Sequence, residues 1–440
     1  MSSSITSSNA PRAPDAKRAP LMSLDQALQA VLDAAQAVSQ TEFVATLQAD
    51  GRVLAQDLVS ALQVPPQDNS SMDGYAVRMC DVQQTGVRLK VTQRIPAGQN
   101  GTALNRGEAA RIFTGAPIPP GADAVVMQED AELLGGTPGQ EPEVQINAVP
   151  STGQWIRRSG EDVTQGAVVL PLGTRLDPAS LGLAASIGLD QLKVVRRPRV
   201  ALFSTGDELV MPGQVPPEKM RPGAIYNSNR FFLRALLLRL GCEVTDMGIV
   251  PDQRDATLAV LQTAAAEHDL ILTSGGVSVG EEDHVKPAVE ALGHLALWQI
   301  SMKPGKPFAF GQVRRVSAVD AAVDETGHAF FMGLPGNPVS SFITFMLLVR
   351  PFLQGLQGVL QAPAQPLRLQ ANFSWPKADR RREFLRAKRD GAGGVDLFPN
   401  QSSGVLTSVV WADGVVDNPS GQTISPGDWV QFYPFSEWLS

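Results

Sequence analysis

The segment LILTSGGVSVGEEDHVK, residues 270–286, joins a short apolar run to a glycine-rich loop and then to three acidic side chains. The run from Leu270 to Thr273 is typical of a buried strand. The loop from Thr273 to Lys286 exposes backbone N–H groups, which bind phosphate at the start of a helix, and a carboxylate beside such a loop usually implies a bridging Mg²⁺. A tight glycine turn followed by an acidic first helical turn is the alternative. The sequence matches neither the P-loop nor the dinucleotide-binding motif.

Strands and helices are predicted to alternate around this segment. Short apolar runs alternating with helices indicate a parallel sheet covered on both faces, and such sheets bind ligands at the carboxyl ends of their strands. Two further polar motifs, STGDE at Ser204 to Glu208 and GLPGNPVSS at Gly333 to Ser341, also follow predicted strands. The predicted strands are Val200 to Phe203, Val244 to Val250 and Leu270 to Thr273, with two more around Phe308 to Phe310 and Phe330 to Met332. The predicted helices are Asn229 to Leu240 and Asp255 to Glu267.

The rest of the chain changes character several times. An amphipathic helix is predicted from Ser23 to Val38, short strands between Glu42 and Asp162, and a second helical segment from Leu176 to Leu192. Residues 314–328 are interpreted as a solvent-facing loop or hairpin. After Pro363, four strand-like runs predict a small β domain: Leu367 to Phe373, Glu383 to Lys388, Val405 to Val410 and Trp429 to Tyr433.

These patterns predict a multidomain α/β plus β protein with a central three-layer α/β domain and a mostly parallel sheet. The β-rich lobe is expected to be inserted into a helical linker domain. The expected division is a flexible tail at 1–20, linker domain I at 21–41 and 167–194, β-rich domain II at 42–166, α/β domain III at 195–362 and C-terminal β domain IV at 363–440.

The composition excludes several classes of protein. With 440 residues, of which 43% are hydrophobic and 18% charged, the chain can bury several cores. A net charge of -7 argues against broad binding to nucleic acid or to an anionic membrane. Only Cys80 and Cys242 are present, too few for a disulfide framework. No apolar run is long enough to span a bilayer and the N-terminus lacks the apolar region of a signal peptide, so a cytoplasmic location is expected.

Four more polar motifs are candidates for chemistry, and each also has an ordinary structural interpretation. DNSSMDGYAVR at 68–78 presents oxygen ligands or is an Asx-rich turn. RIFTGAPIPPG at 111–121 holds Thr114 rigidly or is a plain turn. RRSGED at 157–162 is half of an anion and metal site or a surface ion-pair loop. KPGKP at 303–307 is an oxyanion clamp or carries two solvated lysines.

Eight motifs, taken together and in order, closely resemble the molybdopterin molybdenumtransferase family of the MoeA type, to which the gephyrin E domain also belongs. They are DNSSMDGYAVR, RIFTGAPIPPGADAVVMQE, RRSGEDV, FSTGDELV, GIVPDQ, TSGGVSVGEEDHVK, MKPGKPFAFG and GLPGNPVSS. The resemblance implies an α/β domain of the molybdopterin-binding type. It also implies an elongated homodimer whose active site lies between domain III of one subunit and domain II of the other. The implied reaction converts adenylylated molybdopterin and molybdate into molybdenum cofactor and AMP, with Mg²⁺ or a similar cation.

The resemblance also implies roles for individual residues. The functionally important polar residues would be Asp73, Thr114, Asp162, Glu208, Asp252 and Asp283. Metal contacts would come from Asp252, Asp283 and Ser278, and the oxyanion would be bound by Lys303, Lys306, Pro307, Ser340, Arg381 and Ser403. Pro335 and Pro338 would shape a loop of the site. His284 stands where the family often has an aromatic residue, and it could tune the pH dependence.

Two other functions fit parts of the same pattern. Adenylylation of molybdopterin uses a similar α/β module, but its proteins usually consist of that module alone and carry a GGTG-type loop, whereas this chain has GGVS. A non-enzymatic scaffold of the gephyrin kind is the second alternative, which the intact set of carboxylates disfavours. Other proteins of molybdenum cofactor biosynthesis are the expected partners.

Overall fold

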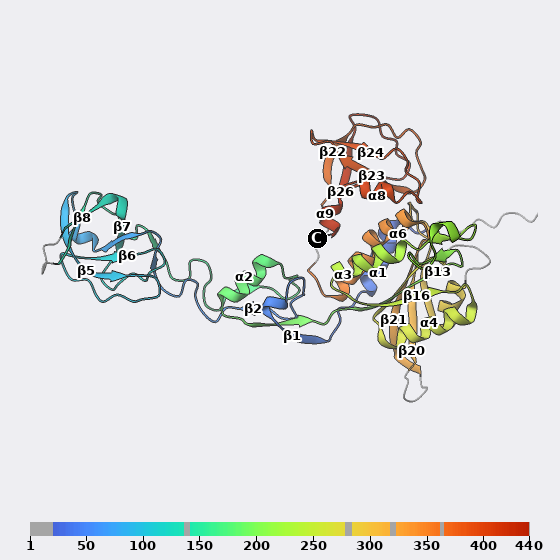
Figure 1. Cartoon of the computed structure of the whole chain (residues 1–440), viewed down its shortest axis with the longest axis horizontal. Helices are drawn as coiled ribbons and strands as arrows, with labels where there is room; N and C mark the ends of the chain where they lie inside the picture. The colour runs from blue at the N-terminus through green and yellow to red at the C-terminus, as the bar shows by residue number, and fades with distance from the viewer. Residues whose placement is uncertain (1–20, 136–140, 278–283, 317–322, 361–364, 440) are drawn as a thin grey trace, which may run out of the picture. The chain divides into compact units, whose positions relative to one another are not determined.

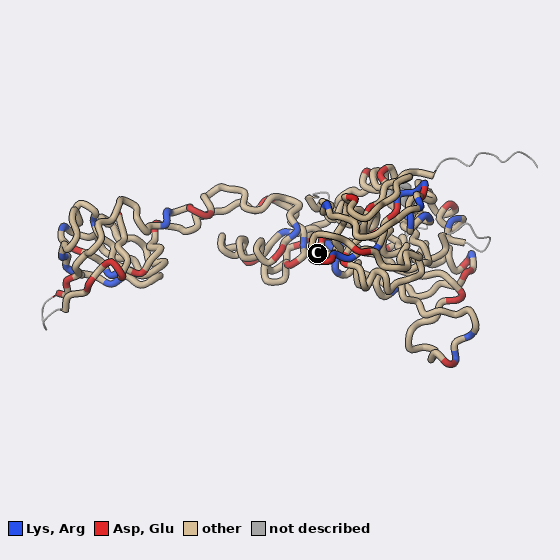
Figure 2. The backbone as a smooth tube through the Cα atoms, turned by 90° about the horizontal axis from the view of Figure 1, so that it is seen from above, with Lys and Arg blue, Asp and Glu red and all other residues tan. Residues whose placement is uncertain are grey.

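The computed structural model describes residues 21–135, 141–277, 284–316, 323–360 and 365–439. These residues form two compact units, of which one comprises residues 41–195 and the other comprises the described residues before and after them (Figure 1). Acidic and basic residues are interspersed in both units (Figure 2), as the modest net charge leads us to expect. The boundaries of the four expected domains remain a prediction.

The larger unit contains a six-stranded sheet with the order β16-β13-β17-β21-β20-β18. The first four strands run parallel, and β20 and β18 are antiparallel to their neighbours. The strands are β13 (Arg199–Thr205), β16 (Glu243–Val250), β17 (Leu270–Ser274), β18 (Gly293–Trp298), β20 (Ala309–Val316) and β21 (Val323–Leu334). The mostly parallel sheet predicted from the sequence is therefore confirmed.

Helices cover both faces of this sheet because its strands carry apolar side chains on both sides. Along β13, Val200 and Leu202 enter one hydrophobic core while Ala201 and Phe203 enter the other, which is the alternation expected of a strand. The first core is covered by α1 (Leu24–Ala34), α3 (Asn229–Arg239) and the helical run formed by α6 (Pro338–Thr344), a π-helical turn (Phe345–Val349) and α7 (Arg350–Leu356). The second core is covered by α4 (Arg254–Glu267) and α5 (Val285–Leu292). The result is the predicted three-layer domain.

Two of the helices that cover this sheet show why the sequence forms them. Helix α1 begins with a capping box, in which Ser23 Oγ accepts from the Gln26 N–H at 3.2 Å and Gln26 Oε1 accepts from the Ser23 N–H at 3.0 Å. The helical run Pro338–Leu356 is long and apolar enough to cross a membrane by composition, but 72% of it is buried inside the protein. It is the core helix of the first layer.

The C-terminal β domain is a closed barrel with the strand order β19-β23-β24-β22-β26-β25, closed by pairing of β23 with β25. Its elements are β19 (Met302–Lys303), β22 (Leu367–Ala371), β23 (Arg382–Arg389), β24 (Gly394–Leu397), α8 (Thr407–Trp411), β25 (Gly414–Asn418), β26 (Trp429–Pro434) and α9 (Phe435–Leu439). The strand predicted at Val405 to Val410 is wrong, because this stretch leads into helix α8. With β23 already paired to β25, the barrel offers this segment no strand edge.

The smaller unit is built on a six-stranded sheet with the order β7-β4-β6-β5-β9-β8. These strands are β4 (Gly74–Val77), β5 (Val87–Ile95), β6 (Glu108–Ile112), β7 (Ala124–Met127), β8 (Ala131–Leu134) and β9 (Glu143–Ile146). Three two-stranded ribbons accompany it: β1 (Thr41–Ala45) with β12 (Gln191–Val195), β2 (Leu58–Val59) with β11 (Val168–Leu170), and β3 (Asn69–Ser70) with β10 (Ile156–Arg157). The predicted β-rich character of this region is confirmed.

The helix predicted from Leu176 to Leu192 is shorter in the structure. Helix α2 spans Pro178–Ser186 and is capped by Asp177, whose Oδ1 accepts from the Ser180 N–H at 2.7 Å. Gly188, with a φ of 85°, then turns the chain away, and Gln191 already belongs to β12.

Candidate functional site

A cavity of about 770 Å³ lies at the carboxyl ends of the parallel strands. Its walls come from the segments that follow β13, β16, β17 and β21, so the motifs singled out in the sequence meet at one edge of the sheet. A short parallel pair, β14 (Leu209–Val210) with β15 (Ile225–Tyr226), adds a further wall. Of the predicted site residues, the cavity is lined by Glu208, Asp252, Pro307, Pro335, Pro338 and Ser340.

The glycine loop after β17 closely approaches the loop after β13. Gly275 and Gly276 have φ values of 95° and 68°, in the left-handed region that favours glycine. A Cβ on Gly275 would lie 2.5 Å from the carbonyl oxygen of Thr205, a contact that a side chain cannot make. The two glycines are therefore required by geometry. The Gly275 N–H donates to the Leu334 carbonyl at 3.0 Å, so within the described part of the loop the Gly276 N–H is the candidate donor to a ligand.

Two carboxylates, those of Glu208 and Asp252, belong to the cavity wall. Asp252 Oδ2 accepts from the Asp207 N–H at 3.3 Å, and Asp207 Oδ1 accepts from the Asp252 N–H at 3.3 Å. Burial raises the pKa of Asp252. The hydrogen bond from the Asp207 N–H and the neighbouring His284 lower it, while the carboxylates of Asp207 and Glu208 raise it. The site therefore favours a cation or a proton beside Asp252.

The carboxylates fit a Mg²⁺ site of the kind that shares its ion with a substrate. Within the described residues, no cluster of three or more His, Cys, Asp or Glu side chains is placed to hold a metal ion. Mg²⁺ commonly uses only one or two carboxylates together with substrate phosphates and water. Glu208 and Asp252 satisfy that lower requirement. Ser278 and Asp283, the other predicted metal contacts, lie outside the described residues.

Sequence reasoning missed a pair of asparagines at the cavity. Asn229 Nδ2 donates to Ser274 Oγ and to the Gly336 carbonyl, both at 2.7 Å, and so ties two walls together. Asn227 Nδ2 and Thr205 Oγ1 are buried and have no hydrogen-bond partner among the described residues. Buried polar groups are rarely left unsatisfied, so these two atoms point to a polar ligand. The signal in the sequence was the NSN triplet at 227–229, whose last residue begins helix α3.

The KPGKP turn, residues 303–307, connects the cavity wall with the C-terminal barrel. Pro307 lines the cavity, and Lys306 is half-buried beside it. Gly305 has a φ of 117°, and a Cβ there would lie 2.5 Å from Thr344 Oγ1, so the turn packs closely on helix α6. Lys303, at the other end of the turn, belongs to strand β19 of the barrel.

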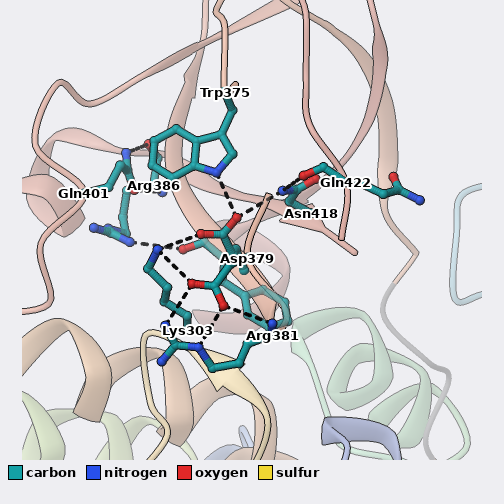
Figure 3. Close-up of polar contacts among 10 residues, drawn as sticks. Lys303, Trp375, Asp379, Arg381, Arg386, Gln401, Asn418 and Gln422 are labelled. Atoms are coloured by element: carbon teal, nitrogen blue, oxygen red, sulfur yellow. Dashed lines mark hydrogen bonds and ion pairs between the residues drawn. The ribbon is translucent and has the colours of Figure 1, made fainter. Parts of the chain in front are cut away.

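Lys303 and Arg381, both predicted to bind an oxyanion, each contact carboxylates in the structure (Figure 3). Lys303 Nζ lies 2.9 Å from Glu383 Oε1 and 3.3 Å from Asp379 Oδ2. Arg381 binds Asp379 through Nε at 3.0 Å and Nη2 at 2.9 Å, and this pairing lowers the pKa of Asp379 well below its usual range. Their role toward an oxyanion stays a prediction.

The barrel loop that carries Ser403 lies against the cavity. The Ser403 carbonyl accepts from the Val339 N–H at the start of α6 at 3.0 Å, and Gly404 lines the cavity. This loop is held by Arg386, a residue missed in the sequence, which is 1% exposed and donates to the Ser402 carbonyl at 3.4 Å and to Ser408 Oγ at 3.2 Å. Burial lowers the pKa of Arg386 to about 10. Its sequence signal was an arginine between Leu385 and Ala387 within a predicted strand.

The remaining predicted residues lie in the smaller unit. Asp73 Oδ1 accepts from both the N–H and the hydroxyl of Thr114, each at 2.8 Å, and these bonds lower the pKa of Asp73. Asp162 is exposed, and its N–H donates to the Val64 carbonyl at 2.9 Å. Arg158 in the same loop pairs with Asp68 at 2.6 Å. Asp73 and Thr114 thus form one polar unit, and Asp162 lies on a separate loop.

Comparison with known proteins matches three family models along the chain. Residues 22–188 match the MoeA N-terminal region (domain I and II), residues 201–355 a probable molybdopterin binding domain, and residues 368–435 the MoeA C-terminal region (domain IV). Together they cover most of the chain.

Individual relatives are similar over most of their length. A molybdopterin molybdenumtransferase of Haemophilus influenzae is 38% identical over 427 residues, which cover 95% of this chain and 100% of that protein. One from Nostoc sp. is 39% identical over 72% of this chain and 70% of its own. Among solved structures, a molybdopterin biosynthesis MoeA protein from Pyrococcus horikoshii has a TM-score of 0.79 and 27% identity, covering 94% of this chain and 100% of that one.

Proposed function

The chain belongs to the MoeA family of molybdopterin molybdenumtransferases, and from this membership we propose that it inserts molybdate into adenylylated molybdopterin and releases AMP. It is a transferase of molybdenum cofactor biosynthesis. The observation that carries the proposal is the strand-end cavity, where a glycine loop, unpaired buried donors and two carboxylates meet. A site of this kind suits a substrate that is both polyanionic and polar.

The substrate pyrophosphate is assigned to the glycine loop. The Gly276 N–H is the candidate backbone donor in the described part of the loop, since the Gly275 N–H already donates to the Leu334 carbonyl, and the Asn227 amide provides a buried donor nearby. These donors are neutral, so the repulsion between the pyrophosphate and the carboxylates of Glu208 and Asp252 would have to be offset by the Mg²⁺ considered below. Asn229 keeps Ser274 and Gly336 in place, so the loop does not need to reorganise when the substrate binds.

The carboxylates of Asp252 and Glu208 are proposed to hold a cation and to exchange protons with the substrate. Mg²⁺ held by Asp252 and Glu208, with Asp283 and Ser278 as further candidates, would neutralise charge on the substrate oxygens. Without the ion, the raised pKa of Asp252 makes its carboxylate a better acceptor for a proton; with Mg²⁺ bound, Asp252 would act as a ligand instead. Lys306, with the Pro307 and Ser340 walls, is assigned to the molybdate, so that the two anions are held close enough to react.

The proposed homodimer has the α/β cavity of one subunit completed by Asp73, Thr114 and Asp162 of the other. Mixing two inactive variants tests this arrangement. Asp73→Asn and Asp252→Asn subunits, each inactive alone, should regain up to about a quarter of wild-type activity when refolded or co-expressed together, because half of the dimers would hold one intact site. If the mixture stays inactive while heterodimers form, the site is built within one subunit.

The function itself is tested by incubating the purified protein with adenylylated molybdopterin, Mg²⁺ and molybdate. Molybdate-dependent AMP release, with activation of a cofactor-free molybdoenzyme, is the expected result. Adenylylation of molybdopterin from ATP would favour the alternative enzyme, and inactivity in both assays would favour the scaffold. Asp283→Ala should lose insertion at limiting molybdate and Mg²⁺, and unchanged insertion would remove Asp283 from the site. The expected location is the cytoplasm.

A further inference from the structure

One carboxylate of the C-terminal β domain is buried where this domain meets the α/β domain. Glu383 is 1% exposed, and its Oε2 accepts from Trp375 Nε1 at 2.8 Å and from Asn418 Nδ2 at 3.2 Å. Its Oε1 accepts from Lys303 Nζ at 2.9 Å. Buried charges are stable only when they are paired, and the Lys303 ammonium is the cation in contact with Glu383 among the described residues.

The backbone reinforces this side-chain pair. Lys303 lies on β19, which joins the barrel by parallel pairing with β23, and the register places Lys303 directly beside Glu383. The same short strand leads into the turn that ends at Pro307 in the cavity wall. The position of the turn is therefore fixed at one end by Glu383 and near its middle by the close packing of Gly305 on α6.

Asp379 restrains the same ammonium from a second direction. Its Oδ2 lies 3.3 Å from Lys303 Nζ, and Arg381 holds Asp379 in place through a two-pronged contact. The Lys303 side chain is nevertheless 41% exposed. An ammonium has three N–H donors, so two carboxylates leave one donor available. The cluster thus orients Lys303 without using all of its hydrogen-bonding capacity (Figure 3).

We propose that Glu383 is a positioning residue for molybdate binding, acting through Lys303: it fixes the Lys303–Pro307 turn and so the cavity wall that receives the oxyanion. This inference rests on the proposed function. Glu383 itself does not line the cavity. Its effect should therefore disappear when Lys303 can no longer transmit it.

The test is a double-mutant cycle on the full-length protein with two measurements, calorimetric titration with molybdate and molybdate-dependent AMP release. Glu383→Gln should weaken molybdate binding and raise the KM for molybdate about tenfold, because small displacements in a binding wall are costly. Lys303→Met should have a similar effect. The double variant should bind molybdate no more weakly than Lys303→Met alone. Its Tm should be higher than that of Lys303→Met, because the buried carboxylate of Glu383 is then no longer left unpaired.

Two more variants keep the test independent of folding defects. Trp375→Phe removes a single donor to Glu383 and should weaken molybdate binding by a smaller factor, about threefold. Asp396→Asn, which alters an exposed carboxylate on β24 of the same domain, is the matched control and should bind molybdate like the wild type.

The outcomes separate the possible failures. If Glu383→Gln lowers the Tm and leaves molybdate affinity unchanged, Glu383 is merely structural and the inference is overturned. The inference is also overturned if the effects of Glu383→Gln and Lys303→Met add, since Glu383 would then not act through Lys303. Wild-type protein that binds molybdate but releases no AMP would refute the proposed function alone. Wild-type protein that binds no molybdate would refute both.

Discussion

Replacing Gly275 with alanine is the sharpest test of the glycine loop. The residue has a φ of 95°, and an added Cβ would lie 2.5 Å from the carbonyl oxygen of Thr205, the last residue of buried strand β13. The obstacle is backbone, so no side-chain rotation can relieve it. An ordinary van der Waals contact begins near 3.4 Å, so the two segments must separate by about 0.9 Å.

Two consequences follow from these numbers. Holding an L-residue in the left-handed region costs roughly 1–2 kcal/mol, which corresponds to a fall in Tm of about 2–8 °C for a domain of this size. The displacement itself should lower kcat/KM for adenylylated molybdopterin by about 10²-fold, since a misplacement of about 1 Å can have this effect. A 10²-fold loss in kcat/KM corresponds to about 2.7 kcal/mol, so the loss in transition-state stabilisation should exceed the cost of the left-handed backbone.

Gly336→Ala is the matched control because Gly336 also lines the cavity but a Cβ there meets nothing within 4 Å. AMP release under limiting substrate and thermal unfolding should be measured for both variants in parallel. We expect the Gly336 variant to behave like the wild type. Equal kcat/KM values for the two variants would show that the approach of the loop to β13 does not set the geometry of the site.

Three other substitutions probe separate parts of the proposed site. The pKa of Asp252 is raised in the folded state, so the free energy of unfolding falls as the pH rises from the ordinary pKa of aspartate through the raised one. Asp252→Asn should therefore have a higher Tm than the wild type at pH 7, and this difference should vanish in acid. The same variant should lose AMP release. Thr114→Val removes one of the two hydrogen bonds to Asp73 and should raise the pKa of Asp73. The acid limb of the pH profile of kcat/KM should then move to higher pH. An acid limb that does not move would mean that Asp73 does not govern it. Asn227→Asp keeps the oxygen that accepts from the Arg230 N–H but replaces a buried donor with a negative charge. The KM for adenylylated molybdopterin should rise by about tenfold or more. A smaller rise would contradict the assignment of Asn227 to substrate binding.

The α/β domain was predictable because local patterns determine most of it. Strands such as Leu270–Ser274 are continuous apolar runs, which is the signature of burial on both faces, and polar motifs follow them at the sheet edge. The prediction failed where the decisive partner is distant. The stretch Val405 to Val410 has strand-like residues, but the barrel closes without it, and only the pairing of β23 with β25 reveals this.

The site was predictable as a set of motifs but not as a set of contacts. Glycines and prolines have local geometric requirements, so the loop at Gly275 and the turn at Gly305 could be recognised from the sequence. The partners of Lys303 could not, because Glu383 lies 80 residues further along the chain and looks like an ordinary strand residue. Arg386 escaped notice for the same reason, since burial of a charged side chain depends on the whole barrel.

The ribbon formed by β1 and β12 has a consequence for how this protein can be divided into fragments. Thr41 and Val195, the first and last residues of the smaller unit, are paired neighbours, and the Arg196 N–H donates to the Gln40 carbonyl at 2.9 Å. Entry and exit of the chain are therefore adjacent, as in domains that tolerate transplantation into a host protein. We therefore expect residues 41–195 to fold when they are expressed alone, and we expect the larger unit to fold when a short linker replaces them.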